Sequence, residues 1–144
     1  MKSILVPVDA ANPARMAAAL AETTRIYAQE AVDVHLLSVQ PEINGHVAMH
    51  LGSHEMQALQ QAAGAEDLAP AQAVLEHSHV PCTTSVRVGR SADTIARTAR
   101  ELGCDRIVLG PEGPDSPVDS MLGSLAQQLR ELVSAGTHCR VIGT

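Results

Sequence analysis

Short apolar runs alternate along the chain with longer stretches in which apolar residues recur every three or four positions. The runs that are rich in β-branched residues or leucine predict strands at 3–8, 32–39, 83–88, 105–110 and 139–143. The stretches between them predict helices, so that strands and helices alternate along the whole chain. Because such alternation is typical of parallel strands joined by crossover helices, the sequence predicts an α/β fold.

Local signals predict where the first helix starts and where the third helix starts and stops. Asn12 is a predicted N-cap followed by Pro13 at the first helical position. The inner face of this helix is predicted to carry Ala17, Leu20, Ala21, Thr24 and Tyr27. The third helix is predicted to start at Ser91 as N-cap and to stop at Gly103. Its apolar face is predicted to carry Ile95, Ala99 and Leu102.

The second and fourth helices are predicted from the spacing of their apolar residues. The second, at about 53–79, carries Met56, Leu59 and Ala63 at helical spacing, and Pro70 predicts a kink or a break in it. It follows a long connection over 41–55. The fourth, at about 121–134, has the most regular apolar face, with the following residues: Leu122, Leu125, Ala126, Leu129, Leu132 and Val133.

The length and composition favour one compact domain over 1–144. Its core must be built from aliphatic residues, because the chain has no Phe or Trp and a single Tyr, Tyr27. The net charge of −6 and the lack of aromatic stacking groups argue against nucleic acid and an anionic membrane as partners. The three cysteines, Cys82, Cys104 and Cys139, show no CxxC spacing and are expected to be reduced, buried small residues.

The chain start, "MKSILVPVDA", lacks the features of a secretory signal, and no window is apolar enough to span a membrane. We therefore expect a cytoplasmic protein.

In an open parallel sheet, ligands bind at the carboxyl ends of the strands. The residues at these ends are Asp9, Val39 with Gln40, Gly89 and the run from Gly110 onward. That run reads Gly110, two residues, Gly113, nine residues, and then Gly123 and Ser124 ahead of a predicted helix. Glycines permit close backbone approach to a ligand, and free N–H groups at a helix start favour anions.

Gly-x-x-Gly, nine residues and Gly-Ser is the nucleotide-binding signature of the universal stress protein family, and the chain resembles that family along its whole length. Other matches are "ILVPVD" in the first strand, "LLSV" in the second and "LGSLAQQL" after the loop. The longest match, "VRVGRSADTIARTARELGCDRIVLG", leads through the third helix into the fourth strand.

The resemblance implies a five-stranded parallel sheet in the order 3-2-1-4-5 and an ATP or other adenine-nucleotide site. It implies that the triphosphate meets the backbone of Gly110, Gly113 and Gly123 and the hydroxyl of Ser124. It further implies that Asp9 faces the nucleoside or its metal, and that the backbone of Val39 reads the adenine edge. Members of the family commonly form homodimers through the last strand, which here is the predicted strand at 139–143.

The loop departs from the family pattern in its charge and its backbone donors. Three acids, Glu112, Asp115 and Asp119, should repel a triphosphate unless Mg²⁺ bridges carboxylate and phosphate. The loop prolines are Pro111, Pro114 and Pro117, which lack the backbone N–H that a phosphate nest uses. The alternative is therefore a nucleotide-free dimeric interaction or signalling protein of the same fold that recognises a protein partner.

Other patterns point less clearly to chemistry. His46, His50 and His54 recur at a spacing that suits a metal on one helix face, but glycines interrupt the segment and a solvated loop is the favoured interpretation. Arg87 and Arg90 could meet phosphates or be surface charges, and the latter is favoured. No nucleophile with a placed base is found, so no catalytic residue is predicted and any ATP hydrolysis should be slow. An adenylating enzyme is a third alternative, but the chain leaves no room for its second substrate region.

Overall fold

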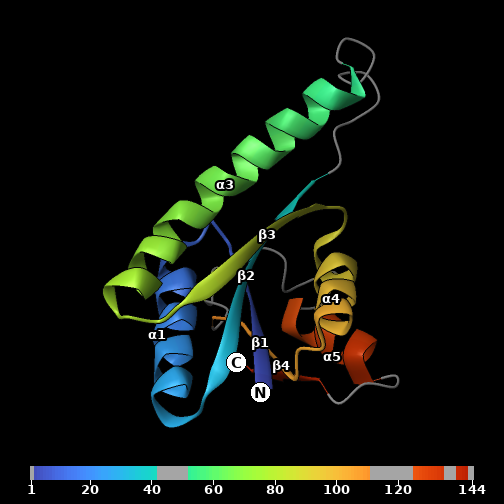
Figure 1. Cartoon of the computed structure of the whole chain (residues 1–144). Helices are drawn as coiled ribbons and strands as arrows, with labels where there is room; N and C mark the ends of the chain where they lie inside the picture. The colour runs from blue at the N-terminus through green and yellow to red at the C-terminus, as the bar shows by residue number, and fades with distance from the viewer. Residues whose placement is uncertain (1, 42–51, 111–124, 135–138, 143–144) are drawn as a thin grey trace.

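A computed structural model describes residues 2–41, 52–110, 125–134 and 139–142. Its centre is an all-parallel sheet in the order β3-β2-β1-β4-β5 (Figure 1), which confirms the predicted α/β fold and strand order. The strands are β1 (Lys2–Pro7), β2 (Val32–Gln40), β3 (Cys82–Val88), β4 (Arg106–Val108) and β5 (Arg140–Ile142). The last two are shorter than the apolar runs that predicted them.

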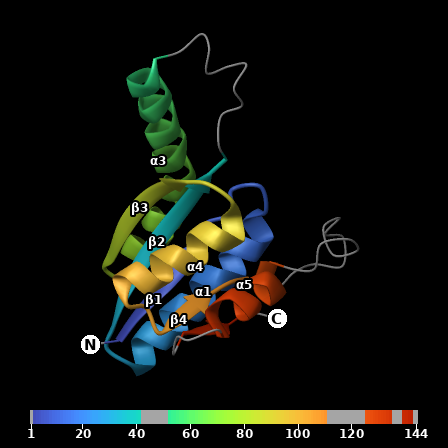
Figure 2. The same ribbon diagram turned by 90° about the vertical axis from the view of Figure 1, so that its right-hand side faces the viewer.

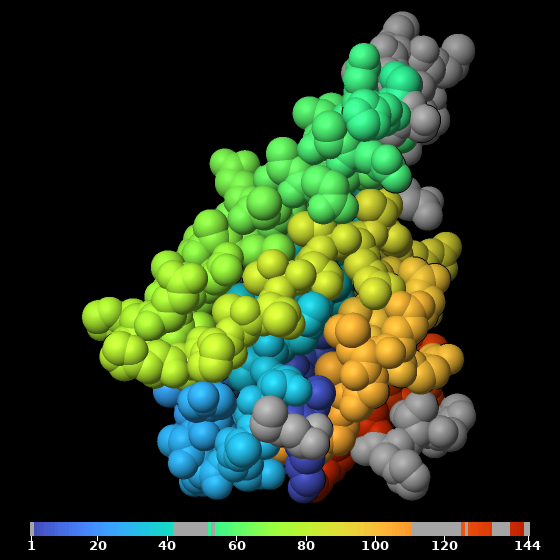
Figure 3. All heavy atoms as spheres, viewed as in Figure 1, coloured from blue at the N-terminus to red at the C-terminus, as the bar shows by residue number. Residues whose placement is uncertain are grey.

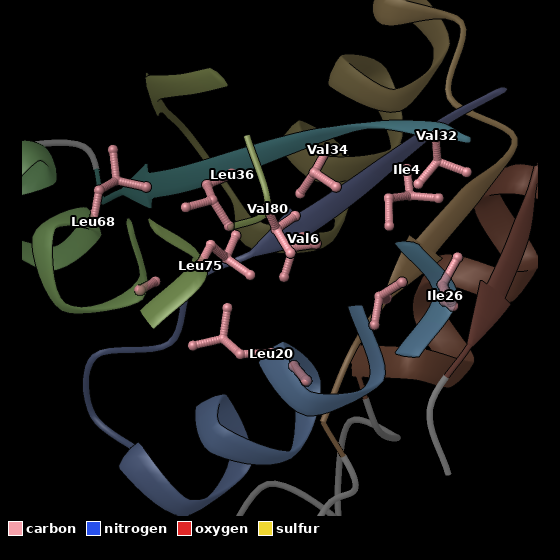
Figure 4. Packing of buried hydrophobic residues seen from close by; sticks show 13 residues of the cluster. Ile4, Val6, Leu20, Ile26, Val32, Val34, Leu36, Leu68, Leu75 and Val80 are labelled. Carbon is pink, nitrogen blue, oxygen red and sulfur yellow. The ribbon is translucent and has the colours of Figure 1, made fainter. Parts of the chain in front are cut away.

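Helices cover both faces of this sheet (Figure 2). On one face α1 (Pro13–Gln29) and α3 (Ser53–His77) bury residues such as Leu20 and Leu75 against Ile4, Val6 and Leu36 of the strands (Figure 4). On the other face α4 (Ser91–Leu102) and α5 (Leu125–Ser134) pack against Leu5, Leu37 and Ile107. Adjacent residues of β1 thus point into opposite cores, as the two-residue period of a strand requires.

The start of α1 agrees with the sequence prediction, whereas its predicted inner face is partly wrong. The Asn12 side chain accepts a hydrogen bond from the Arg15 amide, and Pro13 is the first helical residue. The buried residues are Ala19, Leu20, Thr23 and Ile26, while Ala17 and Ala21 are exposed and Thr24 and Tyr27 are half-buried. Alanines occur at several positions around this helix, so they do not define its buried face.

The sequence predicted a kink or a break near Pro70, and the break is wrong, because α3 runs without interruption from Ser53 to His77. Leu68, Ala71 and Leu75 are buried against the sheet on both sides of Pro70, which is itself exposed. Tertiary packing therefore holds the helix together across a missing N–H donor. The first turns of α3 extend beyond the sheet (Figures 1 and 3), and Leu59 is 55% exposed there.

The N-cap of α4 is Arg90 rather than Ser91, which is the first helical residue, and no side chain caps this end. Gly103 ends the helix in the left-handed conformation, as predicted, with φ 68°. Ile95 and Ala99 are buried, but Leu102 is 41% exposed, so the predicted apolar face is wrong at its last position. The first residues of the predicted fourth helix, 121–124, lie outside the described residues.

All three cysteines are free thiols, but only Cys104 is buried, while Cys82 and Cys139 are half-buried. Burial is the main reason that the pKa of Cys104 is raised to about 11. Burial likewise raises the pKa of Cys82 and of Cys139. These environments keep the thiols protonated and poorly nucleophilic at neutral pH.

Candidate functional site

A cavity of about 400 Å³ lies at the carboxyl ends of β1, β2 and β4. Its walls come from the segment after β1 (Val8–Ala11), from the end of β2 (Ser38–Pro41), from Leu109 and Gly110 after β4, and from α1, α3, α4 and α5. The strand order places β1 and β4 side by side although they are far apart in sequence, so this is the point where the winding direction reverses. Asp9, Val39 and Gly110, which the sequence nominated separately, line this one cavity.

The turn that carries Asp9 is held by its own backbone and by α1. The Asp9 amide donates to Met16 Sδ at 3.1 Å, and its carbonyl accepts from the Asn12 amide at 3.1 Å. Its Oδ1 accepts from the Ala11 amide at 3.2 Å. The carboxylate is 42% exposed. It is thus fixed on one oxygen and accessible from the cavity.

Arg15 joins the segments that follow β1 and β4. Its Nε donates to the carbonyl oxygen of Gly110 at 3.0 Å, and its Nη1 lies 4.0 Å from Asp9 Oδ2. Its side chain is only 13% exposed and lines the cavity. The sequence analysis did not identify Arg15, because nothing in the first turn of a helix signals a contact with a residue 95 positions away.

The backbone of Arg15 also explains why position 110 is glycine. A Cβ on Gly110 would lie 2.0 Å from the Arg15 carbonyl oxygen and 2.6 Å from its Cγ. No carbon atom can occupy that space, so the close approach of α1 to the end of β4 requires a residue without a side chain.

Gln40 is held at the end of β2 by hydrogen bonds to its side chain and its backbone. Its Nε2 donates to Ser38 Oγ and to Asp67 Oδ2, each at 2.9 Å, and its carbonyl oxygen accepts from the Gly89 amide at 3.0 Å. Gly89 turns the chain into α4 with φ 149°, where a Cβ would lie 2.6 Å from Thr94 Oγ1. Asp67 of α3 was not identified from the sequence, since it is one of several acids on that helix.

The predicted surface role of Arg87 agrees with its contacts, since it forms an ion pair with Glu101 of α4 at 2.5 Å. Neither Arg87 nor Arg90 belongs to the described residues that line the cavity. His54 is exposed near the start of α3. Within 2–41, 52–110, 125–134 and 139–142, no group of three His, Cys, Asp or Glu residues could hold a metal ion.

The remaining predicted site residues lie outside the described residues. They include the glycines and serine of the phosphate motif, Gly113, Gly123 and Ser124, and the loop acids, Glu112, Asp115 and Asp119. The same holds for the loop prolines, Pro111, Pro114 and Pro117, and for His46 and His50. Their roles stay predictions.

A second, wider hollow of about 830 Å³ lies at the opposite ends of the strands, beside the amino ends of β2 and β3. His35 lines it, with Nδ1 2.5 Å from Thr83 Oγ1 and Nε2 2.6 Å from Ser85 Oγ. Burial, assisted by the charge of Arg87, lowers the pKa of His35. Open parallel sheets bind ligands in the crevice at the carboxyl ends of their strands. We therefore take the smaller cavity as the candidate site.

The sheet order and the position of the cavity define a doubly wound α/β protein with a ligand crevice at its switch point. A family model described as universal stress protein family matches residues 1–135. The chain therefore belongs to the universal stress protein family.

Solved structures share the fold over nearly the whole chain. A hypothetical protein whose biochemical function was assigned from its structure aligns with 99% of this chain and 94% of its own, with a TM-score of 0.73 and 21% identity. The universal stress protein UspA from Lactobacillus plantarum aligns with 99% of this chain and 96% of its own, with a TM-score of 0.67 and 27% identity.

Several similar structures were determined with adenine nucleotides. A universal stress protein family protein from Arabidopsis thaliana has AMP bound, and it aligns with 99% of this chain and 90% of its own at a TM-score of 0.66 and 17% identity. Two further similar structures are universal stress proteins in complex with cAMP and, from Archaeoglobus fulgidus, with dAMP.

None of the described helices has the length and the apolar character needed to cross a membrane.

Proposed function

We propose that this protein binds an adenine nucleotide, ATP in particular, in the cavity at the carboxyl ends of β1, β2 and β4, and acts as a regulatory module in stress adaptation. The observation that carries the proposal is the convergence of Asp9, Val39 and Gly110 on one cavity at the switch point of the sheet. Members of the same family that hold AMP, dAMP or cAMP support it.

The cavity suits a nucleotide in its size and its mixed lining. About 400 Å³ lies within the range of roughly 300–1,000 Å³ that is usual for small-molecule sites. Ile95, Leu109 and Leu125 offer an apolar surface for a purine ring, beside the backbone of Val39, which would read the adenine edge. The accessible carboxylate of Asp9 would meet the ribose or a bound metal.

The charges that line the cavity favour binding together with Mg²⁺. Its described lining holds two acids, Asp9 and Asp67, and one cation, Arg15, whose side chain is engaged with Gly110. A triphosphate brought there adds further negative charge, and Mg²⁺ would offset it by bridging phosphate and carboxylate oxygens. The acids of the loop at 112–119 add to the same requirement. We therefore expect ATP to bind more tightly with Mg²⁺ than without it.

The site supports binding more than turnover. The acids of the cavity are Asp9, which is bonded to its own turn, and Asp67, which is bonded to Gln40, so neither is placed as a base for water among the described residues. We propose that ATP hydrolysis, if present, is slow compared with nucleotide exchange.

The direct test is calorimetric titration of ATP and AMP, with and without Mg²⁺, into the wild type and two tryptophan variants. Ala11 is exposed and lines the cavity, so Ala11→Trp should fill it and weaken binding at least tenfold. Ala14 is exposed in the first turn of α1 and does not line it, so Ala14→Trp is the matched control and should bind like the wild type. Equal binding by both variants, or no binding by the wild type, would refute the proposed site.

We further propose that the protein forms a homodimer through β5. Among the strands of the described residues, β5 lies at the end of the sheet order and has β4 as its single neighbour. The Arg140 amide donates to Asp105 and the Ile142 carbonyl accepts from Leu109, so both groups point toward β4. Because successive residues of a strand alternate, the N–H and C=O of Val141 point to the open edge, where a second β5 could pair with them.

A further inference from the structure

The side chain of Gln40 is fixed in one orientation by two hydrogen bonds. Asp67 Oδ2 belongs to a carboxylate, which can only accept, so the amide group of Gln40 must present its nitrogen to Asp67. The second hydrogen of that nitrogen is used by Ser38 Oγ, on a residue that is only 2% exposed. The usual ambiguity between the nitrogen and oxygen ends of a glutamine amide is therefore removed by the chemistry of Asp67.

This arrangement leaves one polar atom of the side chain, Oε1, which can only accept hydrogen bonds. Among the hydrogen bonds of the described residues, none uses Gln40 Oε1. Gln40 and Asp67 both line the cavity, and the Gln40 backbone is tied to Gly89 of the neighbouring connection. Gln40 thus brings to the cavity lining an acceptor whose polarity is fixed before a ligand arrives.

We propose that Gln40, held by the positioning residue Asp67, selects adenine by accepting a hydrogen bond from its 6-amino group; this inference rests on the proposed nucleotide site. The proposed base-reading backbone is that of Val39, and both Val39 and Gln40 line the cavity, so a base held there would have its edge within reach of this side chain. The 6-amino group of adenine donates, whereas the 6-oxo group of hypoxanthine accepts. An acceptor at Gln40 therefore bonds to adenine and repels hypoxanthine.

The test compares the dissociation constants of AMP and IMP, which differ in the donor and acceptor groups of the base edge. The wild type is expected to prefer AMP about 10- to 100-fold, the range expected when one buried polar contact is lost. In Asp67→Asn the new amide can accept or donate, so Gln40 can turn over and present its nitrogen to the cavity. The preference for AMP should then fall at least about threefold, and the part that remains is the part read by the Val39 backbone.

A double variant restores the acceptor by exchanging the two groups. In Gln40→Glu with Asp67→Asn, the Asn amide donates to the Glu carboxylate, whose other oxygen accepts from the ligand. The preference for AMP should return to at least the wild-type level, which a general loss of folding could not produce. Glu66→Gln is the charge-matched control, because Glu66 is exposed, adjacent in sequence and outside the cavity lining.

The outcomes separate this inference from the site on which it rests. An unchanged AMP preference in Asp67→Asn, with AMP still bound, overturns the role of Gln40 and leaves the nucleotide site intact. A change confined to the ratio of AMP to dAMP shows that Gln40 reads the sugar and also overturns it. If the wild type binds neither AMP nor IMP, the nucleotide site fails, and this inference fails with it.

Discussion

Gly110 shows that one glycine of the predicted phosphate motif has a packing role of its own. Its missing side chain makes room for the backbone of Arg15, whose guanidinium bonds to the Gly110 carbonyl. The motif glycines are commonly explained by approach to a ligand, but here a second reason exists without any ligand. Changes at this position will therefore affect stability as well as binding.

Gly110→Ala should lower the free energy of unfolding by about 1–3 kcal/mol or more, because the added methyl group overlaps the Arg15 carbonyl oxygen. Gly52→Ala is the control, since a Cβ at Gly52 meets no atom within 4 Å, and its expected loss is the smaller one of replacing the N-cap of α3. Urea unfolding of both variants measures the difference. Equal unfolding midpoints for the two would show that α1 does not approach Gly110 this closely.

His35 should make the stability depend on pH. Its pKa in the folded protein is lowered, mainly by burial, so the folded state binds the proton less readily than the unfolded state does. The free energy of unfolding is therefore unaffected well above the ordinary pKa of about 6.5 and falls as the pH drops below it. Denaturant unfolding between about pH 8 and pH 5 measures this slope.

The variant His35→Gln isolates this contribution, because glutamine can bond to both Thr83 and Ser85 but does not titrate. Its stability should change less with pH over the same range. His54→Gln, at an exposed position in α3, is the control and should keep the wild-type slope. A His35→Gln curve as steep as that of the wild type would assign the pH dependence to other groups.

At the scale of elements, the sequence was sufficient for the order of strands and helices but not for every helix face. The strand runs and the caps at Asn12 and Gly103 are local signals, and they were predicted correctly except that β4 and β5 are shorter than their runs. The buried face of α1 was not, because alanines surround that helix and only its contacts with the sheet select Ala19 and Thr23. Periodicity identifies a helix more reliably than it identifies the face that a neighbouring element covers.

In the candidate site, too, residues with a local sequence signal could be predicted and residues placed by tertiary contacts could not. Asp9, Val39 and Gly110 follow strands directly, so the topology rule could bring them together before the structure was known. Arg15 and Asp67 come from helices and reach the cavity through contacts between distant segments. Such contacts leave no local pattern, and these two residues could be found only in three dimensions.

At the scale of the helix α3, replacement of Pro70 should produce a measurable gain of stability. Packing of Leu68 and Ala71 keeps α3 continuous although proline removes one hydrogen bond from its interior. Pro70→Ala should therefore raise the free energy of unfolding by about 1–3 kcal/mol. Pro81→Ala, in the exposed segment before β3, should instead leave stability unchanged or slightly lower it. Thermal and urea unfolding test this, and a loss of stability in Pro70→Ala would contradict it.

At the scale of the whole molecule, the open edge at β5 predicts the oligomeric state. Val141→Pro removes the outward N–H of this strand but keeps the bonds of Arg140 and Ile142 to the β4 side. We expect sedimentation velocity to show a dimer for the wild type and for the control Val141→Ala, and a monomer for Val141→Pro. A wild-type monomer, or a Val141→Pro dimer of unchanged affinity, would exclude pairing through this edge.

The two hollows lie at opposite ends of the strands, so one measurement can test the central claim. ATP with Mg²⁺ is added to the isotope-labelled protein, and the amide chemical shifts measured by NMR report which of the two hollows binds the nucleotide. We predict the largest changes at Asp9, Gln40 and Gly110, around the carboxyl-end cavity. The largest changes at Asp33, Thr83 and Cys104, which line the opposite hollow, or no changes at all, would contradict the account.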